Sequence, residues 1–271
     1  MKIHHLNCGT FCPSCKKLLQ GSGGLLETAR MCCHCLLIET NDSLILVDTG
    51  FGVQDIVHSK HLGRAFKLLM QPQLLLEETA LFQIDKMGFN RRDVKNIILT
   101  HLDLDHAGGI SDFPMANIHA CSTEVEAALN PRNWMEKSRY RAKQFSYKPK
   151  WTATINTTES WFGFENVQRL KGIHEDILLV PLHGHTQGHC GVAVKNADNQ
   201  WLFHVGDLYM DRRSLDGKAP SLLRQAENLM AADNKQRLSY IKRVKQLIDQ
   251  HSNEVQVFCS HDFSELNSYI S

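Results

Sequence analysis

Four separated segments of the sequence carry His and Asp side chains of the kinds that bind metal ions. The first is the run 101–106 (HLDLDH), and the later segments supply His185, Asp207 and His261. Imidazole and carboxylate groups hold Zn, Mn or Fe while leaving positions open for water. A single histidine among fifteen is more often an ordinary surface or core residue. Four such segments, each just after an apolar run, instead predict one metal centre.

The spacing within the first segment indicates two ions rather than one. Alternate side chains of an extended loop point the same way, so His101 and Asp103 can reach one ion. Asp105 and His106 then turn toward a second ion, and an aspartate placed between two ions can bridge them. The predicted ligand set is His101, Asp103, Asp105, His106, His185, Asp207 and His261.

Two adjacent divalent ions predict a hydrolase. They lower the pKa of a bridging water from ~15.7 toward ~7, which supplies a hydroxide nucleophile at neutral pH. One ion polarises the carbonyl or phosphoryl oxygen of the substrate, and the other stabilises the leaving oxygen. Asp105 can both bind metal and orient or accept the proton. Such a site needs no Ser or Cys nucleophile, and Asp105 and Asp207 are its predicted catalytic carboxylates.

The elements that must position these residues alternate between strands and helices. Apolar runs predict strands over 35–40, 43–48, 95–100, 117–120, 177–182, 191–194, 201–205 and 255–259. Apolar spacing predicts helices over 77–87 and 234–249, the latter with Leu238, Ile241, Val244 and Ile248 on one face. Hydroxyl and acidic residues at 122–124 predict the start of a third helix, over 122–129. Glu124 is typical of an acidic residue at a helix N-terminus. This alternation predicts an α/β layered fold, with one domain over residues 1–271.

Taken in order, the motifs resemble those of the metallo-β-lactamase superfamily. Its signature is an H-x-H-x-D-H loop, a G-H-T-x-G-H segment, a bridging Asp and a terminal His; here these correspond to 101–106, 184–189, Asp207 and His261. The resemblance extends over nearly the whole chain from 48–50 onward and is nearest to the lactonase-like hydrolases. It implies an αββα sandwich and the cleavage of a small lactone or ester.

One position departs from the family pattern. Asp103 stands where the signature has its second histidine, and a carboxylate there makes the first metal position harder and more anionic. That change favours oxygen-loving ions and is similar to the iron-carrying flavodiiron branch of the superfamily. We expect two divalent ions with Asp103 as a ligand. Zn is favoured, with Fe or Mn as alternatives.

Further residues near the motifs invite roles in catalysis. Tyr209 lies two residues after Asp207, and the resemblance to lactonases implies that its phenol donates to the developing oxyanion. His183, His189 and His204 flank the ligand segments and can orient ligands through their second nitrogen, although purely structural roles explain them equally well.

The substrate class stays open among related chemistries. A small lactone or ester is preferred, and the nearest rival is a thioester, as in the hydroxyacylglutathione hydrolases. A third hypothesis is a catalytically weak member of the fold that binds a ligand or a partner protein. We expect a small-molecule substrate in each enzyme case, and the oligomeric state stays open, a homodimer included.

Composition excludes several other classes. Thirty basic and twenty-nine acidic residues give a formal charge of +1, which predicts neither a nucleic-acid binder nor a membrane-surface protein. The stretch 137–151 mixes basic and aromatic residues without a clean period. It is typical of a lid or insertion, although base stacking by such a stretch is conceivable.

The nine cysteines suggest one further kind of site, a zinc or redox site formed by thiols. Cys12 and Cys15, together with the cluster 32–35, have the spacing of a zinc ribbon or redox site. An odd number of scattered cysteines instead favours free, mostly buried thiols in a reducing compartment. With no apolar run long enough to span a bilayer, we expect a cytoplasmic protein.

Overall fold

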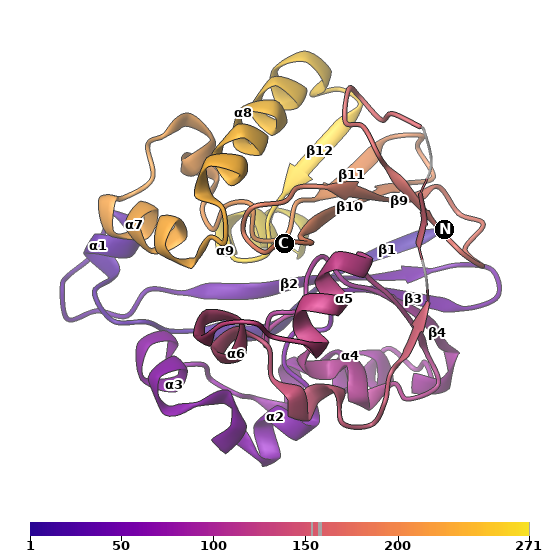
Figure 1. The fold of residues 1–271 in the computed structure, drawn as a ribbon, viewed down its shortest axis with the longest axis horizontal. Helices are drawn as coiled ribbons and strands as arrows, with labels where there is room; N and C mark the ends of the chain where they lie inside the picture. The colour runs from indigo at the N-terminus through magenta and orange to yellow at the C-terminus, as the bar shows by residue number, and fades with distance from the viewer. Residues whose placement is uncertain (153, 157–158, 271) are drawn as a thin grey trace.

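Two six-stranded sheets lie face to face at the centre of the molecule, with helices on the outer face of each (Figure 1). The structure is a computed structural model that describes residues 1–152, 154–156 and 159–270. Its layers follow the order helix, sheet, sheet, helix. The predicted αββα sandwich is therefore confirmed.

The first sheet is built from the N-terminal half of the chain. Its strands, in spatial order, are β1 (Lys2–Phe11), β2 (Met31–Glu39), β3 (Leu44–Val47), β4 (Val94–Ile98), β5 (Asn117–His119) and β6 (Lys150–Thr152). The first three pair antiparallel, and β3 to β6 pair in parallel. The hairpin predicted around residues 41–42 is the turn between β2 and β3, and β1 was not predicted.

The second sheet comes from the C-terminal half. Its order is β12 (Val255–Phe258), β11 (Trp201–His204), β10 (Cys190–Lys195), β9 (Ile177–Pro181), β8 (Gln168–Leu170) and β7 (Thr154–Asn156). Because β10 is antiparallel to both β9 and β11, and β12 is parallel to β11, three strands run the same way. The ends of β9, β11 and β12 therefore meet at one edge of the sheet.

The helices cover the outer faces and the ends of the sandwich. They are α1 (Lys16–Gln20), α2 (Val53–Val57), α3 (Arg64–Met70), α4 (Ala80–Lys86), α5 (Ser122–Leu129), α6 (Trp134–Arg139), α7 (Ser221–Met230), α8 (Asn234–His251) and α9 (Phe263–Ile270). Short 3₁₀ turns lie at Ser59–Leu62, Leu76–Glu78, Arg91–Asp93, Gly108–Asp112, Ala142–Phe145 and Arg212–Asp216. The three predicted helices correspond to α4, α5 and α8.

Alternation along the strands divides the core into layers. Leu36 and Ile38 of β2 pack with Leu179 and Phe258 of the other sheet, which places them between the sheets. Leu37, one position out of phase, packs in the cluster under the helices of the first sheet. Successive side chains of a strand point to opposite faces, so this pattern is what a sheet buried on both sides requires.

The buried face of α8 is rotated by part of a turn from the face that the sequence predicted. Leu238 is 42% exposed, whereas Ile241, Val244 and Leu247 are buried against the second sheet. The buried guanidinium of Arg237 donates to the Leu208 carbonyl and occupies the position on the helix that Leu238 was expected to fill. A polar group with buried acceptors has here displaced the apolar residue from the inner face.

Part of the stretch 137–151, predicted as a lid or insertion, is packed into the first layer. Residues 137–151 contain the end of α6, a 3₁₀ turn and the start of edge strand β6. Tyr140 and Phe145 are buried in the core under the helices of the first sheet. Two of the aromatic residues that broke the pattern in the sequence are therefore core residues, and Tyr147 and Trp151 are partly buried against the same core.

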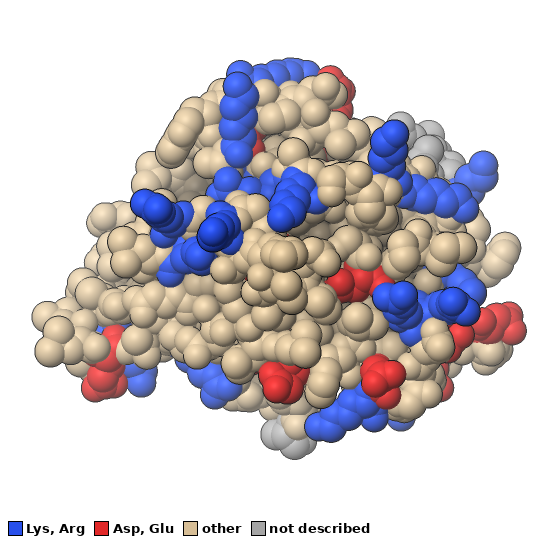
Figure 2. All heavy atoms as spheres, turned by 90° about the horizontal axis from the view of Figure 1, so that it is seen from below, with Lys and Arg blue, Asp and Glu red and all other residues tan. Residues whose placement is uncertain are grey.

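Charge is dispersed on the face shown in Figure 2. Lys and Arg side chains form several separate groups there, with uncharged side chains between them. Within the described ranges, none of the helices is long and apolar enough to cross a membrane.

Candidate metal centre

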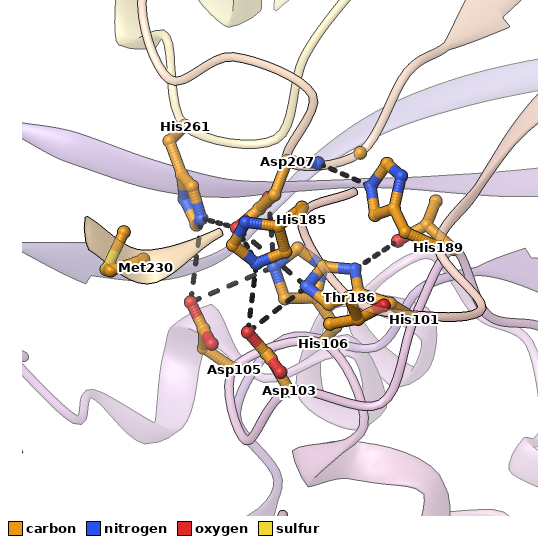
Figure 3. Close-up of polar contacts among 12 residues, drawn as sticks. His101, Asp103, Asp105, His106, His185, Thr186, His189, Asp207, Met230 and His261 are labelled. Carbon is orange, nitrogen blue, oxygen red and sulfur yellow. Dashed lines mark hydrogen bonds and ion pairs between the residues drawn. The ribbon is translucent and has the colours of Figure 1, made fainter. Parts of the chain in front are cut away.

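Every predicted metal ligand follows the end of a strand. His101, Asp103, Asp105 and His106 lie in the loop after β4, in the first sheet. His185 follows β9, Asp207 follows β11 and His261 follows β12, in the second sheet. Figure 3 shows their side chains converging from the two sheets on one small volume. The sandwich thus joins segments that are far apart in the sequence.

A first group consists of His101, Asp103, His185 and Asp207, whose ligand atoms all lie within 4.8 Å of one another. Asp103 Oδ2 is 3.4 Å from His101 Nε2 and 3.1 Å from His185 Nε2. Asp207 Oδ2 lies 3.6 Å from the same atom of His185. Ligands held at about 2.0–2.2 Å around a tetrahedral ion are separated by roughly 3.3 Å, so this spacing fits one ion.

A second group consists of Asp105, His106, Asp207 and His261. His106 Nε2 is 3.3 Å from Asp207 Oδ1, and His261 Nε2 is 3.1 Å from Asp207 Oδ2. Asp105 Oδ2 lies 3.6 Å from His261 Nε2. The thiol of Cys33 on β2 shares this volume with Asp105 and His261. Asp207 belongs to both groups, which is the place that a bridging ligand would take.

Unpaired buried atoms test whether these residues fit metal ions. Within the described ranges, His101 Nε2, Asp103 Oδ1, His106 Nε2 and Asp207 Oδ1 are buried without a hydrogen-bond partner. Buried polar atoms without partners are costly and rare in folded proteins. Three of them, His101 Nε2, His106 Nε2 and Asp207 Oδ1, lie within 3.4 Å of another predicted ligand. Unpaired imidazole and carboxylate atoms in this arrangement form a donor set suited to divalent ions.

Hydrogen bonds behind the imidazoles fix which nitrogen faces the site. Asp48, at the end of β3, accepts from His106 Nδ1 at 2.9 Å and from the Thr100 hydroxyl at 2.8 Å. That hydroxyl oxygen in turn lies 3.0 Å from His101 Nδ1. His261 Nδ1 donates to the Cys32 carbonyl at 2.7 Å. In each case Nε2 is left free for a ligand role.

Glu124, near the start of α5, clamps two ligand loops together. Its Oε1 accepts from the Leu102 amide at 3.0 Å and from the Tyr140 hydroxyl at 3.0 Å. Its Oε2 accepts from the Thr186 hydroxyl at 2.7 Å and from the Gly188 amide at 3.0 Å. The sequence marked Glu124 only as a helix-start residue, and nothing local to it indicated this role.

Of the three histidines that flank the ligand segments, His189 and His204 support a ligand, and His183 lies away from the ligands. His189 Nε2 accepts from the Asp207 amide at 3.0 Å, and His204 Nδ1 accepts from the Gly206 amide at 3.1 Å. Both therefore hold the turn that presents Asp207. His183 has its ring beside Tyr240 and makes no hydrogen bond to a ligand within the described ranges.

Arg139, the last residue of α6, reaches the first group. Its Nη1 donates to Asp103 Oδ2 at 2.8 Å and lies 2.9 Å from His185 Nε2, while Nη2 donates to the Met230 carbonyl at the end of α7. Figure 3 shows Met230 beside the ligand cluster. The sequence placed Arg139 in a basic and aromatic stretch and gave no sign of this contact.

The charges of the site act against the cost of burial. Burial raises the pKa of Asp103, but Arg139 and His101 hold it well below its usual range. Burial likewise opposes ionisation of Asp207, and His261 and His106 outweigh it. Burial is the largest influence on Asp105, whose pKa is raised. At neutral pH, Asp103 and Asp207 are therefore held as carboxylates.

Tyr209 lies outside the ligand cluster. Its side chain is fully buried in the core of the second layer, and its hydroxyl donates to Glu265 Oε1 at 3.2 Å. The backbone turn that directs Asp207 inward sends the side chain two residues later into the core. The predicted oxyanion role of Tyr209 therefore does not fit the structure.

All nine cysteines are free thiols, and seven of them are buried. Within the described ranges, neither Cys12 nor Cys15 belongs to a group of three potential metal ligands. The structure thus brings no group of potential metal ligands together around Cys12 and Cys15, and it pairs no cysteines among the described residues. Cys33, from the cluster 32–35, instead lies with Asp105 and His261 in one group of potential metal ligands, and not with Cys12 and Cys15.

The orienting role of Asp48 gives a first prediction. We expect Asp48→Asn to weaken metal binding roughly 10- to 100-fold, as loss of a carboxylate behind a ligating imidazole does. The amide cannot both accept from His106 and retain the negative charge that strengthens this donor. The measurement is a chelator-competition titration. Asp42→Asn, in the exposed turn after β2, is the matched control and should leave the affinity unchanged; equal effects of the two variants would contradict the role.

Comparison with known proteins agrees with this geometry. Residues 32–215 match the family model described as the metallo-beta-lactamase superfamily. A protein of Mycobacterium tuberculosis named as a metallo-hydrolase is 38% identical over 264 residues, which are 97% of this chain and 80% of that protein. An N-acyl homoserine lactonase of Bacillus thuringiensis is 24% identical over 239 residues, 86% of this chain and 82% of that enzyme.

Solved structures show the same fold. An N-acyl homoserine lactone hydrolase with N-hexanoyl-L-homoserine bound at its catalytic metal centre superposes with a TM-score of 0.73 at 20% identity, over 98% of this chain and 95% of that one. A dizinc quorum-quenching lactonase superposes with a TM-score of 0.63 at 18% identity, over 96% and 87% of the two chains.

Proposed function

The chain belongs to the metallo-β-lactamase superfamily and is a metallo-hydrolase, and we propose that it opens a small lactone or cleaves a small ester with two divalent ions. The main support for this proposal is that Asp207 lies in one ligand group with His101, Asp103 and His185 and in another with His106 and His261. Relatives and structural neighbours that act on N-acyl homoserine lactones support the lactone class.

Each ligand group would hold one ion. His101, Asp103 and His185 would bind the first, Asp105, His106 and His261 the second, and Asp207 would bridge them. Such ions would lower the pKa of water toward ~7, which would supply hydroxide at neutral pH, and they would polarise a carbonyl oxygen. Zn is the first candidate, with Fe or Mn as alternatives because Asp103 adds a hard oxygen donor.

The chain's own residues then handle the proton and the geometry. Burial raises the pKa of Asp105, which places a carboxylate able to take up a proton beside the reacting atoms. His189 and His204 hold the Asp207 turn, and Glu124 holds the two ligand loops at a fixed separation. Prepositioned groups of this kind reduce the reorganisation that a reaction requires.

A cleft of about 380 Å³ adjoins the second group. His261 forms part of its wall, and Leu19, Met31 and Leu223 line it together with the charged turn 211–213. Its mixed lining would accept a short acyl chain beside a polar head. This cleft is our candidate for the acyl portion of the substrate.

A panel of N-acyl homoserine lactones, simple aliphatic lactones, aryl esters and acyl-glutathione thioesters tests the proposal. We expect the highest kcat/KM among lactones, lower values for esters, and loss of all activity on chelation. A preference for the thioesters by tenfold or more would contradict the lactone assignment and favour the hydroxyacylglutathione-hydrolase alternative.

The nine free thiols favour a reducing compartment, and we propose that the enzyme works in the cytoplasm.

A further inference from the structure

The two metal positions differ in the charge that surrounds them. The first group is in direct contact with the Arg139 guanidinium, through Asp103 and His185. Within the described ranges, no Lys or Arg side chain forms a hydrogen bond or an ion pair with Asp105, His106 or His261. The second group has the Cys33 thiol as an additional potential donor. The positions are therefore electrostatically unequal.

Arg139 occupies a place that an ion in the first position has to share. Its Nη1 lies within 3 Å of both Asp103 Oδ2, at 2.8 Å, and His185 Nε2, at 2.9 Å. An ion bound to those two atoms at the usual ~2.0–2.2 Å would lie within about 5 Å of the guanidinium nitrogen. Arg keeps its charge at every physiological pH, so the two cations repel each other.

Burial makes this repulsion strong. The Arg139 and Asp103 side chains are only 11% and 15% exposed, so water screens them little. A third hydrogen bond, to the Met230 carbonyl, keeps the guanidinium in place. An ion can bind in the first position only if it displaces this side chain or shares Asp103 with it.

We propose that Arg139 makes the first metal position the weaker of the two, so that the chain retains one ion tightly at the second position and exchanges the other. The inference rests on the proposed pair of metal positions but concerns their affinities rather than the reaction. It also gives the aspartate at position 103 a consequence, because a carboxylate attracts a guanidinium, whereas the neutral imidazole of the family pattern carries no charge to do so. Occupancy of the first position, and with it the activity, would then rise and fall with the free metal concentration.

Stepwise metal titration of the full chain tests the proposal directly. Zinc is added to metal-free protein in the presence of a competing chelator, and bound zinc is counted by plasma mass spectrometry. We expect two affinities in the wild type that differ by at least tenfold. His185→Ala should remove the weaker ion and leave the tighter one. Two equal affinities in the wild type would overturn the proposal, whether or not any variant folds.

Substitution of Arg139 gives the causal test. Arg139→Met should increase the affinity for the weaker ion roughly 10- to 100-fold and leave the affinity for the tighter ion unchanged. An effect of this size is typical of one adjacent buried charge on an ionic equilibrium. Arg139→Lys keeps the charge and should stay close to the wild type. Arg141→Met, two residues along, removes a half-buried arginine that donates to the Leu62 carbonyl and should change neither affinity.

Other outcomes would overturn the role of the charge. No gain in Arg139→Met, or an equal gain in Arg139→Lys or Arg141→Met, would show that the guanidinium does not set the affinity. Because the readout is bound metal, a chain that shows these affinities but hydrolyses no lactone would refute the proposed substrate class and leave this inference standing.

Discussion

Asp207→Ala should lose at least one bound ion per chain and lower kcat/KM at least about 1000-fold, which corresponds to ~4 kcal/mol of transition-state stabilisation. Asp207 is the residue that lies in both ligand groups, within 3.6 Å of His185 and 3.1 Å of His261. Its removal leaves the remaining ligands without their shared carboxylate. Metal content by plasma mass spectrometry and steady-state hydrolysis of the preferred lactone measure the two effects.

Cys12→Ser is the control for this prediction. Cys12 lies in the N-terminal motif that looked like an alternative metal site, and the substitution should leave metal content and turnover unchanged. A Cys12→Ser variant that loses metal, or an Asp207→Ala variant that keeps two ions and turns over within tenfold of the wild type, would contradict the assignment of the site.

Glu124→Ala should lower the free energy of unfolding of the metal-free protein by about 3–5 kcal/mol. The substitution strands four donors that the carboxylate satisfies, from Leu102, Tyr140, Thr186 and Gly188. Glu124→Gln should lower the free energy of unfolding less than Glu124→Ala does, because its amide oxygen still accepts two of the four hydrogen bonds. Its NH₂ group faces the other two donors and leaves them without an acceptor. Urea unfolding followed by circular dichroism measures the difference.

The same helix supplies the matched control. Glu126 is exposed and pairs only with Arg132 in the described part of the chain, so Glu126→Ala should change the unfolding free energy by about 0.5 kcal/mol or less. If Glu124→Ala cost no more than Glu126→Ala, the clamp between the two ligand loops would have no energetic weight.

The convergence of the seven proposed metal ligands could be predicted because their signal is local. Each ligand follows an apolar run that ends a strand, and the spacing of 101–106 is visible within six residues. The same kind of signal located β2, β3 and α5. An edge where several strands end is a common place for a site, so strand ends and ligand types together carried the prediction.

Glu124 and Arg139 could not be predicted because their partners are distant in the sequence. The donors to Glu124 come from the loop after β4, from α6 and from the loop after β9, which meet only in the folded chain. Arg139 looked like one more basic residue in a polar stretch, and its partner Asp103 looked like a simple ligand change. Tyr209 failed for the opposite reason, since its nearness to Asp207 in sequence does not translate into nearness of side chains.

One reconstitution experiment tests whether this chain is a dinuclear metallo-hydrolase. Metal-free protein is loaded at saturating free zinc, and bound zinc per chain and N-hexanoyl homoserine lactone hydrolysis are measured on the same sample. We predict two ions per chain, with hydrolysis that disappears on chelation and returns with the metal. No bound metal and no turnover after reconstitution with zinc, iron or manganese would contradict the claim.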